Sequence, residues 1–169
     1  MSDIPDTETP QPEYGRFDSE EAFQQAVDRL LEQNGRELRV FDPDLESLRL
    51  NLPERITRLE RFLQASRTRR IYVVVHDTDY VSRFCPRLMT LLARYAHAMQ
   101  IHRTHEEIRE LQDAFLVLDA SHYVRRPVAE LWRGAAGVND DTEALAMRSR
   151  FHEIWEASYP AVSGTTIGL

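Results

Sequence analysis

Hydrophobic positions along this chain repeat with the spacings of both helices and strands, and the two kinds of segment alternate. Phe23, Val27, Leu30 and Leu31 have the helical spacing, which recurs in three later segments. Shorter runs rich in β-branched and aromatic residues separate these segments and predict strands. The predicted helices begin near Asp18, Asn51, Pro86 and Asp140, and the predicted strands span residues 37–41, 71–75, 99–102, 115–118 and 122–126.

The strongest of these strands, Ile71–Val75, is apolar at every position, which is typical of a strand buried on both faces of a parallel sheet. Residues 115–118 and 122–126 flank a short polar turn and predict an antiparallel hairpin, and residues 127–139 are predicted to form a loop. The order of elements predicts an α/β fold. We expect a mixed sheet of parallel strand–helix–strand units plus the hairpin, with helices on both faces.

Charge divides the chain into an acidic arm and a neutral remainder. The formal net charge is −7, and residues 1–35 account for all of it. Residues 1–16 are polar, acidic and rich in proline, which predicts a disordered leader, and residues 17–169 are predicted to form a single domain. All 21 basic residues are arginine, which excludes chemistry that depends on lysine, such as a phosphate-loop lysine or a Schiff base.

Cysteine content and hydropathy indicate the cellular environment. A single cysteine, Cys85, excludes an internal disulfide and favours a reducing compartment. The longest apolar run is far shorter than the roughly 20 residues of a membrane helix, and the acidic N-terminus does not resemble a secretory signal. We therefore expect a cytoplasmic protein without a membrane partner.

Polar residues follow three of the predicted strands, at the point where each strand ends. Because the carboxyl ends of parallel strands share one edge of a sheet, where ligands commonly bind, we expect these side chains to converge. They are Asp42, Asp44, His76, Asp77, Asp79, Arg103 and His105. An aspartate after a strand also commonly caps the next helix or forms a turn, so each of them has a structural alternative.

Asp77 and Asp79 also resemble the Asp-x-Asp-x-Val opening of haloacid-dehalogenase phosphatases. That resemblance implies a metal-dependent phosphohydrolase, in which one aspartate attacks phosphorus and the other handles the proton of the leaving group. His97, His102 and His105 lack a clear zinc-ligand spacing, so we expect no metal and no cofactor there.

The second strand of the hairpin carries two arginines and a histidine. His122 and Arg126 point to one side of this strand with Val124, and Tyr123 and Arg125 point to the other. Arginine beside histidine suits the recognition of phosphate or carboxylate groups. A solvated edge strand is the alternative interpretation.

The C-terminal half resembles the phospholipase D superfamily in its order of elements and in its ending, Phe151-x-x-x-Trp155-x-x-Ser158. The signature of that superfamily is His-x-Lys-x₄-Asp. With Asp119 at the aspartate position, Gln112 replaces the histidine and Ala114 replaces the lysine. The histidine of the superfamily is the nucleophile and its lysine binds phosphate, and neither glutamine nor alanine provides these functions.

Two further positions of the signature are also replaced. Arg126-Pro127 stands where the superfamily has Gly-Ser, and Glu130 stands where it has asparagine. The stretch from Glu37 to Leu169 also resembles an uncharacterised proteobacterial domain of unknown function, which implies no activity.

These resemblances imply a non-catalytic phospholipase D-like domain that acts as a binding or regulatory module with a site for phosphate or carboxylate groups. The site predicted from them consists of His76, Asp77, Asp79, Arg103, His105, Gln112, His122, Arg125 and Arg126. Single-motif members of the superfamily pair two half-sites, so the resemblance implies a homodimer, with a protein partner as a further expectation. A metal-dependent phosphohydrolase and a nucleic-acid-binding module stay open as alternatives, although the zero net charge of residues 36–169 disfavours nucleic acid.

Overall fold

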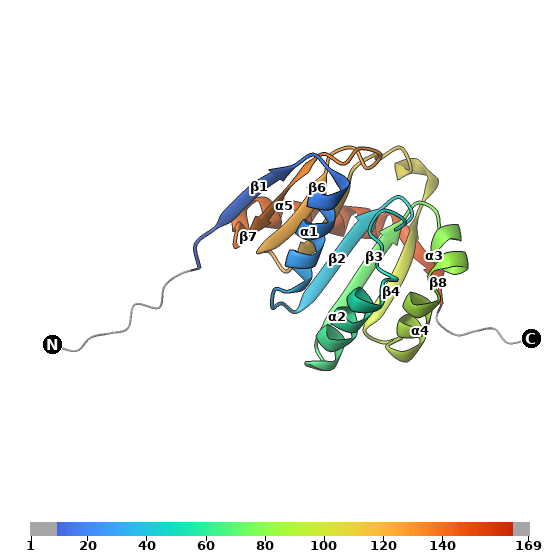
Figure 1. Cartoon of the computed structure of the whole chain (residues 1–169). Coiled ribbons are helices and arrows are strands. Elements are labelled where there is room, and N and C mark those ends of the chain that lie inside the picture. Colours follow the sequence, from blue (N-terminus) through green and yellow to red (C-terminus); the bar gives the residue numbers. More distant parts are fainter. Residues whose placement is uncertain (1–9, 164–169) are drawn as a thin grey trace, which may run out of the picture.

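A computed structural model describes residues 10–163 of the chain, and one mixed sheet organises it (Figure 1). The strands are β1 Glu13–Phe17, β2 Glu37–Asp42, β3 Arg70–Val75, β4 Met99–Thr104, β5 Ala114–Leu118, β6 His122–Arg126, β7 Gly134–Val138 and β8 Ser158–Val162. The helices are α1 Glu20–Leu31, α2 Pro53–Gln64, α3 Asp79–Phe84, α4 Pro86–Arg94 and α5 Asp141–Glu156, with a 3-10 turn, η1, at Glu106–Ile108. Within the described residues the eight strands lie in the order β1-β7-β6-β5-β2-β3-β4-β8.

The centre of the sheet follows the predicted topology. Strands β2, β3 and β4 are parallel, and helical crossovers connect them. Strand β5 runs antiparallel to β2, and β5 and β6 form the predicted hairpin. In its turn Asp119 adopts a left-handed backbone conformation with φ of 53°, and its Oδ1 accepts the backbone N–H groups of Arg36 and Glu37, each at 2.9 Å.

Helices cover both faces of the sheet, as predicted. Leu38 and Val40 of β2 face a core formed with α1, α2, α3 and α4, whereas Phe41 faces a second core formed with α5. This division follows from the alternation of side chains along a strand. Figure 1 shows α5 behind the sheet and α1 and α2 in front of it. The chain therefore has the predicted α/β architecture.

The outer strands differ from the prediction. Residues 13–16, predicted to belong to the leader, form most of β1, and β7 lies inside the predicted loop 127–139. Strand β8 was not predicted either, because its sequence contains Pro160 and it pairs with β4 only at the sheet edge. Weak alternation at an edge provides little sequence signal. Residues 10–12 of the predicted leader have no regular secondary structure, and residues 1–9 lie outside the described residues.

Three features of the helices also differ from the prediction. The N-cap of α1 is Ser19, not Asp18, because the Ser19 hydroxyl accepts the backbone N–H of Ala22 at 3.2 Å. Helix α3 was not predicted as a separate element, since it has only six residues and Cys85 separates it from α4. The Asn51 side chain accepts the backbone N–H of Leu88 in α4 at 3.0 Å, so it caps a different helix from the one predicted.

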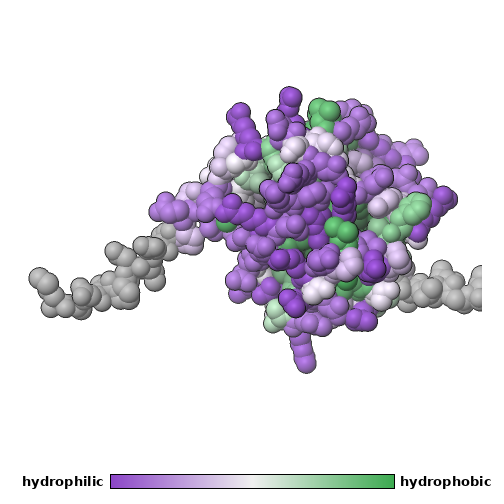
Figure 2. All heavy atoms as spheres, in the orientation of Figure 1, coloured by the Kyte–Doolittle hydropathy of each residue, from purple (hydrophilic) through white to green (hydrophobic). Residues whose placement is uncertain are grey.

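The face of the molecule drawn in Figure 2 is mainly hydrophilic. In the face drawn in Figure 2, hydrophobic atoms form small separated areas among hydrophilic ones. Across residues 10–163, no helix combines the length and the apolar character that crossing a bilayer requires.

Candidate functional site

A cleft of about 860 Å³ lies at the carboxyl end of β2 and is the main candidate for a ligand site. Its position agrees with the edge at which open α/β sheets commonly bind ligands. The cleft is bordered by the β2–α2 loop, helix α3, the start of α4 and the segment after β6. Its lining residues are Glu20, Asp42, Pro43, Asp44, Glu46, Ser47, Arg49, Asn51, Leu52, Tyr80, Phe84, Arg87, Arg126, Ala129, Glu130 and Trp132.

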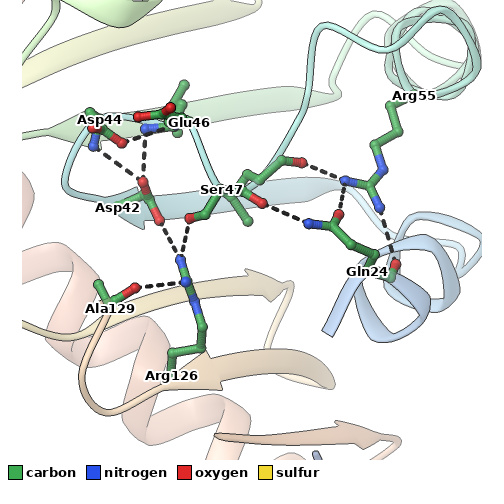
Figure 3. A network of polar contacts seen from close by, with 10 residues as sticks. Gln24, Asp42, Asp44, Glu46, Ser47, Arg55, Arg126 and Ala129 are labelled. Atoms are coloured by element: carbon green, nitrogen blue, oxygen red, sulfur yellow. Dashed lines mark hydrogen bonds and ion pairs between the residues drawn. The ribbon is translucent and has the colours of Figure 1, made fainter. Parts of the chain in front are cut away.

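A buried ion pair joins two sides of this cleft. Arg126 Nη2 lies 3.0 Å from Asp42 Oδ1, and the side chains are 2% and 1% exposed. The same Nη2 donates to Ser47 Oγ at 2.6 Å, and Nη1 donates to the carbonyl oxygen of Ala129 at 2.7 Å. Figure 3 shows Arg126 pointing from β6 toward the loop that follows β2. Most hydrogen-bonding capacity of this guanidinium is therefore used within the protein.

Aromatic rings enclose the same guanidinium. The Arg126 Cζ atom lies 4.4 Å from the centre of the Phe23 ring and 5.3 Å from that of Trp132, which are cation–π distances. Burial lowers the pKa of Arg126, against the opposing effect of Asp42. Burial likewise raises the pKa of Asp42 to about 6, although Arg126 and the backbone N–H groups of the loop lower it. Desolvation is thus the larger effect on both members of the pair.

The loop after β2 is held in an unusual conformation by these charged groups. Leu45 has a φ of 71° and Arg49 a φ of 46°, both in the left-handed region that non-glycine residues rarely adopt. Asp42 Oδ2 accepts the backbone N–H of Leu45 at 2.7 Å. From the other side, the Arg55 guanidinium donates to the carbonyl oxygen of Leu48 and to Gln24, whose amide in turn donates to Ser47 O at 2.8 Å (Figure 3). Hydrogen bonds from two arginines therefore hold the wall of the cleft.

The rim of the cleft combines aromatic rings with charges of both signs. The rings of Tyr80 and Phe84 lie 5.4 Å apart, and Phe84 is 63% exposed. Arg49 pairs with Glu20, which leaves Arg87 as the one lining arginine without an ion-pair partner among the described residues. Carboxylates outnumber arginines in the lining. Such a surface suits a ligand with a planar ring and little negative charge.

Three of the predicted site residues lie close together beyond the cleft, at the ends of β3 and β4. The Nε atom of Arg103 donates to the backbone oxygen of His76 at 2.9 Å. One ring nitrogen of His76 bonds Thr104 Oγ1 at 2.7 Å and the other bonds the carbonyl oxygen of Leu111 at 2.8 Å. The next residue, Gln112, is exposed. Both ring nitrogens of His76 therefore have protein partners, whereas Arg103 Nη1 and Nη2 have none among the described residues.

Asp77, Asp79 and His105 have local structural contacts. Asp77 Oδ1 accepts the backbone N–H of Asp79 at 2.8 Å, which is the turn-forming alternative anticipated for these aspartates. The His105 ring lies 5.0 Å from the Tyr159 ring. Among residues 10–163, no three histidine, cysteine, aspartate or glutamate side chains are grouped so that they could hold a metal ion. The metal-dependent phosphohydrolase based on Asp77 and Asp79 stays a prediction.

His122 and Arg126 lie at opposite ends of strand β6. His122 pairs with Leu118, near the start of β2, and its Nδ1 accepts the backbone N–H of Asn139 at 3.1 Å. Burial lowers the pKa of His122. Arg125 is half-buried and pairs with Phe115, and the alternation along β6 places it on the α5 face, opposite Arg126. The structure therefore does not bring His122 and Arg125 together with Arg126.

The replaced positions of the phospholipase D signature lie close together beside the cleft. Ala114 on β5 stands directly across from Arg126 on β6, so the replacements of the lysine and of Gly-Ser are neighbours on one face of the sheet. The carbonyl oxygen of Gln112 accepts the backbone N–H of Ala129 at 2.7 Å, next to Glu130. Asp119, the retained aspartate, lies at the far end of β5 and stabilises the start of β2.

Sequence reasoning missed several residues of the cleft. Tyr80 and Phe84 have the i, i+4 spacing of one helix face, which was a usable signal once α3 was recognised. Ser47 gave no comparable signal, because its hydrogen bond with Arg126 joins residues 79 positions apart in the sequence.

Solved structures of other proteins share this fold. Nuc from Salmonella typhimurium, a phospholipase D family member, is 11% identical with a TM-score of 0.60, over 90% of this chain and 100% of that one. NucT from Helicobacter pylori is 10% identical with a TM-score of 0.53, over 89% of this chain and 100% of that one. At these identities the likeness concerns the fold alone.

A third structure, TrmBL2, is described as an archaeal chromatin protein with a novel mode of DNA binding. It is 12% identical with a TM-score of 0.65, over 94% of this chain and 57% of that one, so the chain spans little more than half of its length. No curated protein sequence matches this chain. A family model described as Domain of unknown function (DUF7931) matches residues 19–163. The chain therefore belongs to the DUF7931 family, and its fold is phospholipase D-like.

Proposed function

We propose that this chain is a non-catalytic binding domain built on the phospholipase D-like fold. The observation that carries this proposal is Arg126, which stands at the Gly-Ser position of the signature and directly across from Ala114. Its side chain is 2% exposed and paired with Asp42. Because Asp42 already neutralises this guanidinium and the protein buries it, Arg126 is a poor substitute for a lysine that binds a phosphoryl group.

The nucleophile of the superfamily also has no replacement nearby. The amide of Gln112 is not a nucleophile, and it has no basic lone pair that could act as a general base. The imidazole of His76 is close in space, but its two ring nitrogens bond Thr104 and Leu111. The residues around Gln112, which stands at the position of the superfamily's nucleophile, therefore support binding rather than phosphodiester cleavage.

The cleft favours a ligand that combines one phosphate with a planar ring. Tyr80, Phe84 and Trp132 offer ring faces and edges, and Arg87 is the unpaired cation on the rim. The volume of about 860 Å³ falls in the range of roughly 300–1,000 Å³ that is typical of ligand sites. Because Glu46 and Glu130 repel additional negative charge, we expect a nucleoside monophosphate to bind more tightly than the corresponding triphosphate.

A thermal-shift series tests this assignment on the full chain. Adenosine monophosphate should raise the melting temperature more than adenosine triphosphate at equal concentration, since saturation at about 100 times the Kd adds about 2.7 kcal/mol. Arg87→Ala should remove the shift. Arg83→Ala is the matched control, because Arg83 lies on α3 outside the cleft lining and should leave the shift unchanged.

The same series separates the alternatives. An equal shift in Arg87→Ala, or no shift with either nucleotide, would contradict the cleft as a site for this ligand class. A larger shift with a single-stranded oligonucleotide that falls steeply with salt would favour nucleic acid instead. The homodimer and the protein partner implied by the family resemblance stay predictions.

A further inference from the structure

A second, smaller pocket lies on the opposite face of the sheet, between α5 and strands β2 and β3. Its volume is about 270 Å³, and none of its lining residues belongs to the cleft described above. It is lined by Arg39, Tyr72, Phe151, His152, Trp155 and Glu156. A pocket below the roughly 300–1,000 Å³ of drug-sized sites has room for a ligand with a single ring.

Arg39 supplies a buried guanidinium, which is ion-paired with Glu37, to the wall of this pocket. The residue is 6% exposed and follows the alternation of β2 that also places Phe41 on the α5 face. Its Nη2 bonds the carboxylate of Glu37, whereas its Nη1 is buried and has no hydrogen-bond partner among the described residues. A buried donor without an acceptor is unfavourable, so an acceptor at this point would be stabilising.

Aromatic rings form the other walls, and their positions are fixed. The Trp155 ring stands edge-on to Tyr72 with ring centres 5.2 Å apart, and it lies 5.9 Å from Phe151. His102 stacks on Trp155 with ring centres 3.6 Å apart. The Ser158 hydroxyl donates to the Trp155 carbonyl oxygen at 2.6 Å, so its oxygen accepts from His102 Nδ1 at 3.0 Å. A rigid aromatic wall loses little conformational entropy when a ring packs against it.

We propose that this pocket is a binding site for a small aromatic carboxylate. The carboxylate would accept from Arg39 Nη1, and the ring would pack against Tyr72 and Trp155, whose own rings contact each other edge to face. A carboxylate suits this position because a charge-assisted hydrogen bond is shorter and stronger than a neutral one. A planar ring suits this pocket because contact between aromatic rings is more stabilising than the burial of their apolar area alone.

Benzoate is the probe, and the fluorescence of Trp155 is the readout. The chain has two tryptophans, so the titration uses Trp132→Phe, which leaves Trp155 as the only fluorescent indole. Benzoate should change this fluorescence saturably. Cyclohexanecarboxylate retains the charge without the aromatic ring, and benzamide retains the ring without the charge. Both should bind at least about tenfold more weakly.

Two arginine variants in the same background test the role of Arg39. Arg39→Met fills the space without a charge and should weaken benzoate binding at least about tenfold. Arg39→Lys retains the charge but not the planar guanidinium. Its affinity for benzoate should therefore lie between that of the protein with Arg39 and that of Arg39→Met. Arg36→Met is the control, because Arg36 is exposed and lies outside the pocket. Wild-type affinity in Arg39→Met, equal binding of benzamide, or no saturable change with benzoate would each overturn the proposal.

Discussion

Replacing Arg126 with methionine should lower the free energy of unfolding by about 3–5 kcal/mol at neutral pH, the range for removing one partner of a buried ion pair. The variant leaves the Asp42 carboxylate buried, and Ser47 Oγ and the Ala129 carbonyl oxygen lose their donor. It also removes the cation that lies over the rings of Phe23 and Trp132. Urea denaturation of the full chain measures this change.

The pH dependence of this loss follows from the titration of Asp42. Burial raises its pKa from 3.8 to about 6, so the folded state binds more protons than the unfolded state between these values. The titration of Asp42 therefore lowers the free energy of unfolding by about 3 kcal/mol as the pH rises from 3.8 to about 6. Arg126→Met removes the main charge that lowers this pKa, so the fall should extend above pH 6. The variant should lose more stability at pH 8 than at pH 5.

Two controls accompany this experiment. Adding Asp42→Asn removes the titrating group, so the effect of Arg126→Met should then be independent of pH. Arg94→Met breaks the pair with Glu60, in which Arg94 is 57% exposed, and should cost no more than about 1 kcal/mol. A cost of Arg126→Met similar to that of Arg94→Met would show that the buried pair does not stabilise the cleft.

Gly134→Ala should have the second large effect, lowering the free energy of unfolding by about 3 kcal/mol, the upper end for overpacking. An added Cβ at this position of β7 would lie 1.9 Å from the Arg125 carbonyl oxygen and 2.7 Å from a ring atom of Phe17. The nearer atom belongs to the backbone of β6, so relief of the clash requires strand β7 to move. Because β1 pairs with β7, hydrogen exchange should accelerate in both strands.

Gly15→Ala provides the matched control in the neighbouring strand. An added Cβ there meets nothing within 4 Å, so the stability should change by no more than about 0.5 kcal/mol. Equal costs for Gly134→Ala and Gly15→Ala would contradict the close approach of β7 to β6.

Periodicity alone predicted the centre of the sheet, because buried strands such as β3 and paired strands such as β5 and β6 have strong local patterns. It missed the edge strands for identifiable reasons. Only Phe17 of β1 is buried, and β7 consists of glycine, alanine and one valine, which are weak strand signals. Tertiary pairing, rather than local preference, makes these segments strands.

The candidate site was less predictable for the same reason. Alternation along β6 correctly placed Arg126 on the same face as Val124, but this arginine was expected to bind an anion or to face solvent, not to pair inside the protein. No local pattern showed that its partner would be Asp42, 84 residues earlier in the chain. Parallel-strand logic correctly brought His76 and Arg103 together, but it could not show that the bonds of His76 are directed to Thr104 and Leu111.

The loss of phosphodiester chemistry is the central claim, and turnover of bis(4-nitrophenyl) phosphate tests it most directly. With Mg²⁺, Mn²⁺ or Zn²⁺ present or absent, the purified chain should release 4-nitrophenolate no faster than the buffer does. Restoring the signature with Gln112→His and Ala114→Lys should not create activity, because Arg126 fills the space beside Ala114. Release above the blank that Gln112→Ala or Asp77→Asn abolishes would contradict the account.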